Sequence, residues 1–276
     1  MSSPTNKQDL AAFWNQSREY YAMAAAANPA ASPERQRMLA HLRGGERVLD
    51  LGSGSCENAL WLPVGCRYTG LDVSLVGLLM AAEAKRPGDR VRGDSEALPF
   101  GDGAFDAVLS TYALEHFHDP GKTLREAARI VRPGGLLMII GSTWDLPYEY
   151  PPSLPRSRRL EVTIRRTWRQ VRGALAGGHR FDTVRNPSVL TEGYLPDADA
   201  VHIAQSQQVA RYLRGLGMEV IEHTTFPHRA EPKGWRGLYR EMLRSVPLWK
   251  NAWGNNLLVA RRGPELATPP YRLLPL

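Results

Sequence analysis

Short apolar runs alternate with polar, glycine-containing turns through the first half of the chain. Five of these runs are predicted to be strands, at residues 48–51, 67–72, a short run before 93, 105–110 and 136–141. Runs of this length suit parallel strands that are buried on both faces of a sheet. Helices are predicted between them, including one that Ser74 caps and that runs to about Lys85. The alternation predicts an α/β fold around an open sheet.

The same pattern returns after a gap of about 60 residues, which is long for a connection within a compact domain. A helix is predicted at 205–216, closed by Gly217, and strands six and seven at 219–226 and 256–261. The prolines from Pro264 onward predict an extended and partly mobile tail.

Helices are also predicted before the first strand. Residues 9–27 are rich in alanine and favour a single helix. Ser32 is the expected cap of a second helix, with Pro33 in its first turn, that runs to Leu42 and stops at Gly44. We expect residues 1–45 to form a helical cover over one edge of the sheet.

The turn after the first strand is the most informative stretch. Asp50 is followed by Gly52, Ser53 and Gly54, and a helix is expected to open at Glu57. Glycine lets the backbone approach a ligand closely, and open α/β sheets bind nucleotides at this end of their strands. The spacing D-x-G-x-G carries no lysine of the phosphate-binding kind. It therefore favours a phosphate-free, cationic nucleoside, and the alternative is an ordinary turn that needs two glycines.

Acidic residues also end the next two predicted strands. Asp72 follows Asp50 by roughly twenty residues, the spacing at which a carboxylate reaches the ribose of a bound nucleoside. Asp94 follows the third strand, where it could accept a hydrogen bond from an adenine amino group. A single acid at a strand end is more often a helix cap than a ligand. Three at successive strand ends predict one shared site.

These motifs resemble the class I S-adenosylmethionine-dependent methyltransferases, in particular the type 11 group that acts on small molecules. The resemblance covers roughly residues 45–142 and weakens after 203. It implies a Rossmann-like, seven-stranded, mostly parallel sheet flanked by helices. Residues 144–203 interrupt this family core, and their length predicts an inserted lid between strand five and the last helix. The matching segments are 48–54, 70–74, 93–100, 105–108, 113–116 and 132–135.

The resemblance also implies roles for individual residues. Asp50, Gly52 and Gly54 would hold the methionine part of S-adenosyl-L-methionine, Asp72 the ribose, and Asp94 with Ser95 the adenine. The remaining candidate cofactor contacts are Ser53, Val73, Tyr112 and Tyr21. Tyr20 or Tyr21, on an N-terminal helix that folds over the cofactor, could reach the methionine carboxylate. Cys56 departs from the family, which usually has a third glycine at this position.

In such an enzyme, the cofactor supplies most of the reactivity. The sulfonium of the cofactor is already activated, so the protein aligns the acceptor and removes its proton where necessary. His116, at the end of the fourth strand, is the candidate catalytic base, because an imidazole titrates near neutrality. The alternative is that His116 only shapes the site.

Residues 144–203 form the predicted insertion, interpreted as a lid or substrate subdomain. Within it, apolar residues recur at helical spacing and arginines occupy the other positions. We expect the apolar stripe to pack on the core with the arginines in water. An anionic acceptor or a membrane surface are the alternatives. The apolar residues are Leu160, Ile164, Trp168, Val171 and Leu175, and the arginines are Arg159, Arg165, Arg166, Arg169 and Arg172.

Composition fits a cytoplasmic enzyme with one main domain. The net charge is +7 and only two cysteines occur, so neither a disulfide framework nor an oxidising compartment is expected. No apolar run approaches the roughly 20 residues that span a bilayer, and no signal peptide is evident. No cysteine, histidine and acid cluster has metal-ligand spacing, and no nucleic-acid motif accompanies the arginines.

The sequence thus predicts a methyltransferase that acts, at oxygen, on a small-molecule, sugar or lipid-like acceptor. A catalytically idle cofactor-binding sensor or scaffold remains an alternative, as does a peripheral membrane enzyme acting on a quinone-like lipid. The oligomeric state is left open. The predicted divisions are 1–45, 46–143 for the cofactor-binding core, 144–203, 204–263 for the rest of the sheet, and 264–276 for the tail.

Overall fold

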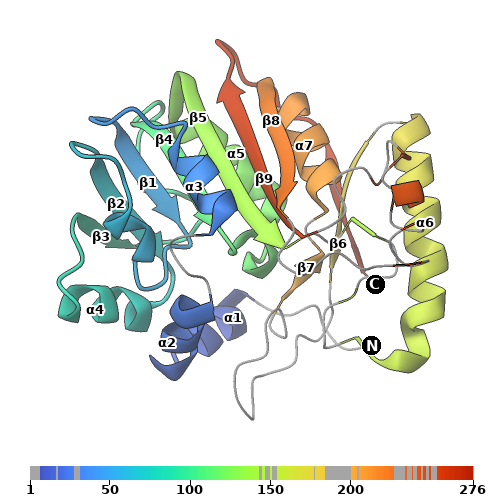
Figure 1. Cartoon of the computed structure of the whole chain (residues 1–276), viewed down its shortest axis with the longest axis horizontal. Coiled ribbons are helices and arrows are strands. Elements are labelled where there is room, and N and C mark those ends of the chain that lie inside the picture. The colour runs from blue at the N-terminus through green and yellow to red at the C-terminus, as the bar shows by residue number, and fades with distance from the viewer. Residues whose placement is uncertain are drawn as a thin grey trace.

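A seven-stranded sheet forms the centre of the molecule (Figure 1). The computed structural model describes residues 7–16, 18–27, 32–142, 145–146, 150, 154–176, 178–183, 200–203, 205–226 and 254–275, and residues 234, 238, 241–243, 245–246 and 249. Within these residues, no helix is both long enough and apolar enough to cross a membrane.

The order of the strands in this sheet is β3-β2-β1-β4-β5-β9-β8. Strand β9 is antiparallel to both of its neighbours, and the other pairs are parallel. The predicted Rossmann-like, mostly parallel sheet is therefore confirmed. The strands are β1 (Arg47–Leu51), β2 (Arg67–Asp72), β3 (Asp89–Arg92), β4 (Phe105–Thr111), β5 (Val131–Ser142), β8 (Met218–Phe226) and β9 (Asn255–Arg262).

Helices flank the sheet on both sides. Two of them follow the sequence closely: the Ser74 hydroxyl caps α4 by accepting the Gly77 N–H at 3.2 Å, and Gly217 turns the chain after α7 with φ of +87°. The helices are α1 (Lys7–Trp14), α2 (Arg18–Ala27), α3 (Pro33–Leu39), α4 (Leu75–Glu83), α5 (Pro120–Ile130), α6 (Arg159–Ala176) and α7 (Ser206–Gly215), with short 3₁₀ turns η1 (Glu57–Leu60), η2 (Leu114–His116) and η3 (Arg156–Arg158).

Side chains alternate between two buried layers along each central strand, as the pleat requires. In β1, Val48 packs with Met38 of α3 on one face, whereas Leu49 faces the layer covered by α5 and α7. In β9, Leu257 faces the same layer as Val48, and Leu258 faces the same layer as Leu49. Because both faces are buried, the strands read as continuous apolar runs.

The predicted single helix over 9–27 is two helices, α1 and α2. The break follows Trp14, whose carbonyl accepts hydrogen bonds from the Ser74 hydroxyl at 2.8 Å and the Tyr21 hydroxyl at 3.1 Å. Asn15 donates to the Ala11 carbonyl and accepts the Leu75 N–H at 2.8 Å. These competing bonds end the helix and fix its C-terminus against the start of α4.

Two other boundaries differ from the sequence pattern. The helix expected at Glu57 is only the 3₁₀ turn η1, because the chain turns again at Pro63 and Gly65 before β2. Strand β5 begins at Val131, five residues earlier than expected. Residues 132–135 are accommodated by a bulge, where the register shifts between Phe105 and Ala107 of β4.

The C-terminal tail is extended, as predicted, and its last part forms a strand that the sequence did not indicate. Strand β10 (Tyr271–Pro275) runs parallel to β6 (His179–Thr183), and β6 also pairs with β7 (His202–Ile203) in a second, three-stranded sheet. The Tyr271 hydroxyl contacts both carboxylate oxygens of Asp119 at 2.7 Å. The tail is thereby attached both to the insertion and to the start of α5.

Helix α6 presents the opposite face from the one that we predicted. Leu160, Ile164 and Trp168 are 73%, 54% and 65% exposed, whereas Val162 and Arg166 are fully buried. The cause is Asp182 of β6, which lies 3.9 Å from Arg166 and forms a 2.7 Å ion pair with Arg169. This partner holds Arg166 and Arg169 inward and leaves the apolar stripe exposed to solvent. The side chain of Leu175 lies outside the described residues.

The contribution of the tail to stability can be measured with a variant of Tyr271. Tyr271→Phe removes a hydroxyl that hydrogen-bonds a buried carboxylate, and should lower the free energy of unfolding by about 1.5–3 kcal/mol. Urea denaturation measures this loss. Arg272→Ala, an exposed neighbour on β10, is the control and should change stability by less than about 0.5 kcal/mol. Equal effects of both variants would contradict the tail attachment.

Candidate functional site

A cavity of about 200 Å³ lies at the carboxyl ends of β1, β2 and β4. Helices α1 and α2 cover it, and Figure 1 shows them beneath the arrowheads of the central strands. All but one of the predicted site residues line this cavity, and Asp50 is the exception. The lining members of the predicted set are Tyr21, Gly52, Ser53, Gly54, Asp72, Val73, Asp94, Ser95, Tyr112 and His116.

The turn after β1 requires glycine because its backbone has positive φ angles and because neighbouring side chains leave little room for a Cβ atom. Gly52 has φ of +74°, and a Cβ there would lie 2.7 Å from Cβ of Ala113. Gly54 has φ of +50°, and a Cβ there would lie 3.3 Å from the Tyr21 ring. The N–H groups of Gly52 and Ser53 both donate to the Leu71 carbonyl, at 2.9 and 3.1 Å. The turn therefore lies tightly between β2 and the helical cover.

Cys56, which stands where the family usually has glycine, keeps the conformation that glycine favours, with φ of +56°. Its side chain is buried with Tyr68 and Leu78 under the turn and is not part of the cavity lining. Burial raises the pKa of the Cys56 thiol. The departure from glycine thus leaves the cavity surface unchanged.

Asp50 lies behind the cavity rather than in its wall. Its Oδ2 accepts hydrogen bonds from the Tyr68 hydroxyl at 2.8 Å and from Nδ2 of Asn58 at 3.0 Å. Burial raises its pKa to about 6, although both hydrogen bonds oppose that change. Asn58 does line the cavity, so Asp50 acts on the site by orienting this amide.

Asp72 joins the glycine turn to α4. Its Oδ2 accepts the Gly54 N–H and its Oδ1 accepts the Ser74 N–H, both at 2.8 Å. Burial raises the pKa of Asp72, while these backbone hydrogen bonds and the nearby His116 lower it. The carboxylate has lone pairs left for a ligand in the cavity.

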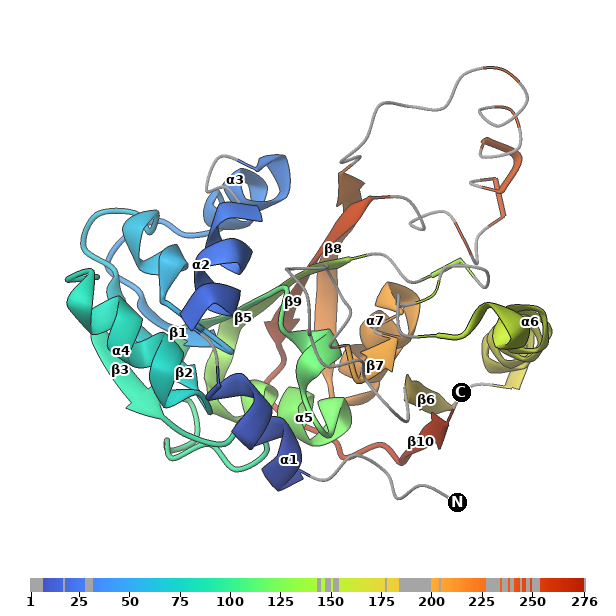
Figure 2. The same ribbon diagram turned by 90° about the horizontal axis from the view of Figure 1, so that it is seen from below.

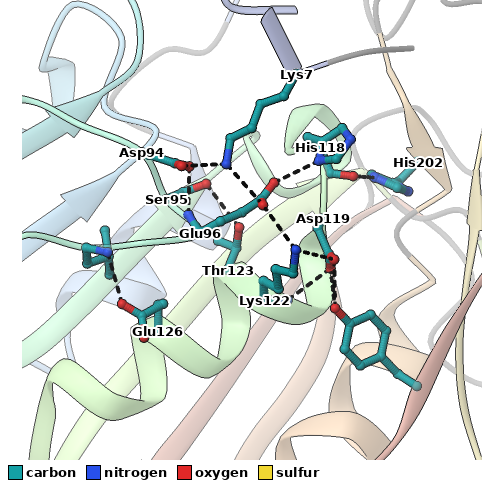
Figure 3. Close-up of polar contacts among 12 residues, drawn as sticks. Lys7, Asp94, Ser95, Glu96, His118, Asp119, Lys122, Thr123, Glu126 and His202 are labelled. Atoms are coloured by element: carbon teal, nitrogen blue, oxygen red, sulfur yellow. Dashed lines mark hydrogen bonds and ion pairs between the residues drawn. The ribbon is translucent and has the colours of Figure 1, made fainter. Parts of the chain in front are cut away.

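The carboxylate of Asp94 is paired with Lys7, a residue that the sequence did not indicate. Figure 3 shows Lys7 reaching from α1 to Asp94 and Glu96, and its Nζ lies 3.0 Å from Oε2 of Glu96. Hydrogen bonds to the two acids outweigh partial burial and raise the pKa of Lys7. The predicted adenine-binding acid is thus also the anchor of the N-terminal cover.

Glu96 extends this network along the rim. Its Oε1 lies 2.9 Å from Nδ1 of His118, and the Ser95 hydroxyl lies 3.0 Å from that of Thr123 (Figure 3). The His118 carbonyl accepts a 2.8 Å hydrogen bond from Nε2 of His202 in β7. Burial lowers the pKa of His202 to about 4.

Tyr112 has a strained backbone at the end of β4, with φ of +51°. Its ring is part of the cavity wall, but its hydroxyl donates to Glu34 of α3 and accepts from Nδ2 of Asn255 at 2.8 Å. Burial raises the pKa of Tyr112 well above its usual value. The predicted cofactor contact of Tyr112 stays a prediction, and its hydroxyl is already engaged by Glu34 and Asn255.

His116 and Trp14 face each other in the cavity, with ring centroids 5.2 Å apart. The cover adds apolar and aromatic surface from Leu10, Trp14 and Tyr20. Tyr21 packs its ring on Gly54 while its hydroxyl binds the Trp14 carbonyl. These contacts create a partly apolar chamber around the predicted base.

Arg35 and Asn58 are further lining residues that sequence reasoning missed. Arg35 is 4% exposed, and its charge favours ionisation of Asp50. The Oδ1 atom of Asn58 is buried without a hydrogen-bond partner among the described residues. Arg35 lies in the first turn of α3, and nothing in the sequence around it indicates a ligand contact. Only the fold brings α3 to the site.

The described part of the insertion contacts the edge of the site without lining the cavity. No described residue of 144–203 lines the cavity. The contacts that it does make are to the rim, through His202 and through the Val201 N–H, which donates to the Glu115 carbonyl at 2.9 Å. Among the described residues, α1 and α2 cover the cavity.

The comparisons agree with this core. Residues 49–139 match the family model described as a methyltransferase domain. Demethylmenaquinone methyltransferase of Renibacterium salmoninarum is 38% identical over 97 residues, which are 34% of this chain and 40% of that protein. The protein of that name from Mycobacterium tuberculosis H37Rv is 42% identical over 96 residues, 34% and 40% of the two chains. The matched segment thus spans less than half of the curated relatives.

Solved structures share the fold over most of the chain. A Haloferax volcanii protein solved with the Trm112 methyltransferase activator has a TM-score of 0.58 at 19% identity, over 94% of this chain and 100% of that one. An S-adenosylmethionine-dependent methyltransferase from Mesorhizobium loti has a TM-score of 0.51 at 18% identity, over 84% and 99%. The resemblance of residues 49–139 to the methyltransferase family, and the fold expected from it, are confirmed.

The raised pKa of Asp50 predicts a pH-dependent difference in stability. An unfolded aspartate titrates near pH 4, so on acidification through about pH 6 the native protein binds a proton first. Wild type should therefore gain roughly 2 kcal/mol over Asp50→Asn between about pH 7 and pH 4.5. Urea denaturation at several pH values measures this gain.

Other titrating groups are common to both proteins and cancel in the difference. Asp102→Asn, at a side chain that is 73% exposed, is the control and should show a difference from wild type that changes little with pH. A constant difference for Asp50→Asn, or one that falls on acidification, would contradict the buried charge at Asp50.

Proposed function

We propose that the chain is an S-adenosylmethionine-dependent methyltransferase and that the cavity at the strand ends binds the cofactor. The observation that carries this proposal is the meeting of the glycine turn, Asp72, Asp94 and His116 in one cavity. The methyltransferase family match over residues 49–139 supports it. When bound, the cofactor supplies an activated methyl group on a sulfonium.

The cavity offers groups that fit each end of that cofactor. Its ammonium would meet the unsatisfied Oδ1 of Asn58, and its carboxylate the guanidinium of Arg35. The free lone pairs of Asp72 would hold the ribose hydroxyls. Asp94 would accept from the adenine amino group while it keeps Lys7. A carboxylate has about four acceptor sites, so both partners can share it.

The acceptor that we propose is a small, largely apolar ring compound with an ionisable hydroxyl. The wall nearest His116 is formed by Trp14 and Phe117, and the cover adds Leu10 and alanines of α2. The arginines of α6, which suggested an anionic acceptor, are not part of this wall. A quinone-like lipid fits in its reduced form, because that form carries hydroxyls, and the curated relatives are named demethylmenaquinone methyltransferases.

His116 acts as the base in this proposal. An acceptor hydroxyl placed between His116 and the methyl group would lose its proton to the imidazole as its oxygen attacks in line. Trp14 packs against the His116 ring and excludes water on that side. We place the enzyme in the cytoplasm, because both of its cysteines are free thiols.

An idle cofactor-binding sensor was the alternative suggested by Cys56. That side chain is buried away from the cavity, so no observation favours the alternative. Transfer of labelled methyl from S-adenosylmethionine to hydroxylated aromatic lipids separates the two functions. Turnover supports the enzyme, and tight binding without transfer to any of these lipids would favour the sensor.

Cofactor binding should depend on Asp72. Asp72→Ala removes a charge-assisted contact to the ribose and should weaken S-adenosylmethionine binding by about 1.5–3 kcal/mol, which is at least tenfold. Isothermal titration calorimetry measures the affinity, with circular dichroism to confirm folding. Asp102→Ala, at an exposed side chain outside the cavity lining, is the control. Wild-type affinity in a folded Asp72→Ala protein would remove Asp72 from the ribose site.

Turnover should depend on His116 more than binding does. His116→Ala should lower kcat by about 10²-fold or more, the usual contribution of a general base, and should change cofactor affinity little. The pH profile of kcat should lose the limb that His116 produces in wild type. A loss in kcat below about tenfold with an unchanged profile would leave His116 only a packing role.

A further inference from the structure

The outer face of α6 carries an apolar stripe without a partner among the described residues. Leu160, Ile164, Trp168 and Val171 are spaced by four, four and three residues and are 36–73% exposed. Val162, Arg166, Gln170 and Gly173 repeat this spacing two residues later and are buried. Two residues turn a helix by about 200°, so the two rows lie on opposite faces.

The inner row fixes this orientation. Gln170 donates to the Asp145 carbonyl at 2.6 Å and accepts from the Trp249 indole at 2.9 Å. A Cβ at Gly173 would lie 3.5 Å from Arg211 and from Gln208 of α7. If helix α6 rolled its apolar stripe inward, Gln170 would turn toward solvent and the Asp145 carbonyl and the Trp249 indole would lose their partner. Each polar group left buried without a hydrogen bond costs about 1–3 kcal/mol.

Arginines surround the stripe. Between residues 156 and 176 the chain has seven arginines and one acid, Glu161. Arg166 and Arg169 face Asp182, and Arg156, Arg158 and Arg172 are exposed. Glu161 pairs with Arg158 at 3.8 Å and with Arg165 at 3.4 Å, and it offsets one of these charges. The outer face of α6 therefore combines a tryptophan, three aliphatic side chains and positive charge.

We propose that this face of α6 docks the protein on the surface of an anionic lipid bilayer. The helix would lie in the plane of the interface, with Leu160, Ile164 and Trp168 among the acyl chains and the arginines at the phosphates. The stripe spans about 17 Å along the helix axis. This inference rests on the insertion alone and holds whether or not the cavity transfers a methyl group.

Charge favours a bilayer over a second copy of the chain. Two copies packed through α6 would bring their exposed arginines together, and each chain carries a net charge of +7. An anionic bilayer instead attracts each basic residue near its surface by about 1 kcal/mol. Both views place α6 at the side of the molecule opposite β3 and α4 (Figures 1 and 2). The helix can therefore contact a surface without displacing the core.

Vesicle flotation of the full chain tests the proposal. Wild type should float with vesicles of equimolar phosphatidylglycerol and phosphatidylcholine, and should float at least about tenfold less with phosphatidylcholine alone or in high salt. Ile164→Glu with Trp168→Glu should lower binding to the anionic vesicles by at least about tenfold. Both side chains are exposed, so the melting temperature should stay near that of wild type.

Val64→Glu with Leu79→Glu is the matched control. Val64 and Leu79 are 97% and 48% exposed on other elements, and the pair adds the same charge. This control should float like wild type. Failure of wild type to float, equal binding to neutral vesicles, or equal losses in both double variants would overturn the proposal. So would a concentration-dependent dimer in light scattering that the α6 variant abolishes, because a second copy would then cover the stripe.

Discussion

The carboxylate of Asp72 ties together the three pieces of chain that form the cavity. One oxygen holds Gly54 of the glycine turn and the other holds Ser74 at the start of α4. The Ser74 hydroxyl in turn binds the Trp14 carbonyl at the end of α1. The turn, the strand end and the helical cover are thus positioned by one buried acid and one cap. The raised pKa of Asp72 reflects the desolvation that this position entails.

The cover depends on polar contacts at both ends of α1. Lys7 pairs with Asp94 and Glu96 at one end, and Asn15 with α4 at the other. Between them the helix supplies Leu10 and Trp14 to the cavity. In the proposed cofactor site, the adenine amino group would share Asp94 with Lys7, the anchor of the cover.

The sheet and most of the cavity could be predicted because their signals are local. The apolar runs 48–51 and 136–141 lie within strands β1 and β5. The glycine turn and two of the strand-end acids, Asp72 and Asp94, line the cavity. Lys7 and Arg35 could not be predicted, because they reach the cavity only through helix packing. Asp50 belongs to the predicted motif but does not line the cavity. It instead accepts hydrogen bonds from Tyr68 and Asn58.

The buried face of α6 and the strand in the tail could not be predicted, for a common physical reason. An amphipathic pattern does not say which face is buried when a distant acid such as Asp182 can pair with arginines in the interior. Nor does a proline-containing tail reveal that β6 offers it a free edge. Both depend on pairings between segments that lie far apart in the sequence.

Hydrogen exchange with and without S-adenosylhomocysteine, the demethylated cofactor, tests the central claim most directly. The account predicts that saturating ligand slows exchange of the amides in residues 52–56 and in α1 and α2, and leaves α6 unchanged. Protection confined to α6, or no protection of the glycine turn at saturation, would contradict a cofactor site at the strand ends beneath the N-terminal helices.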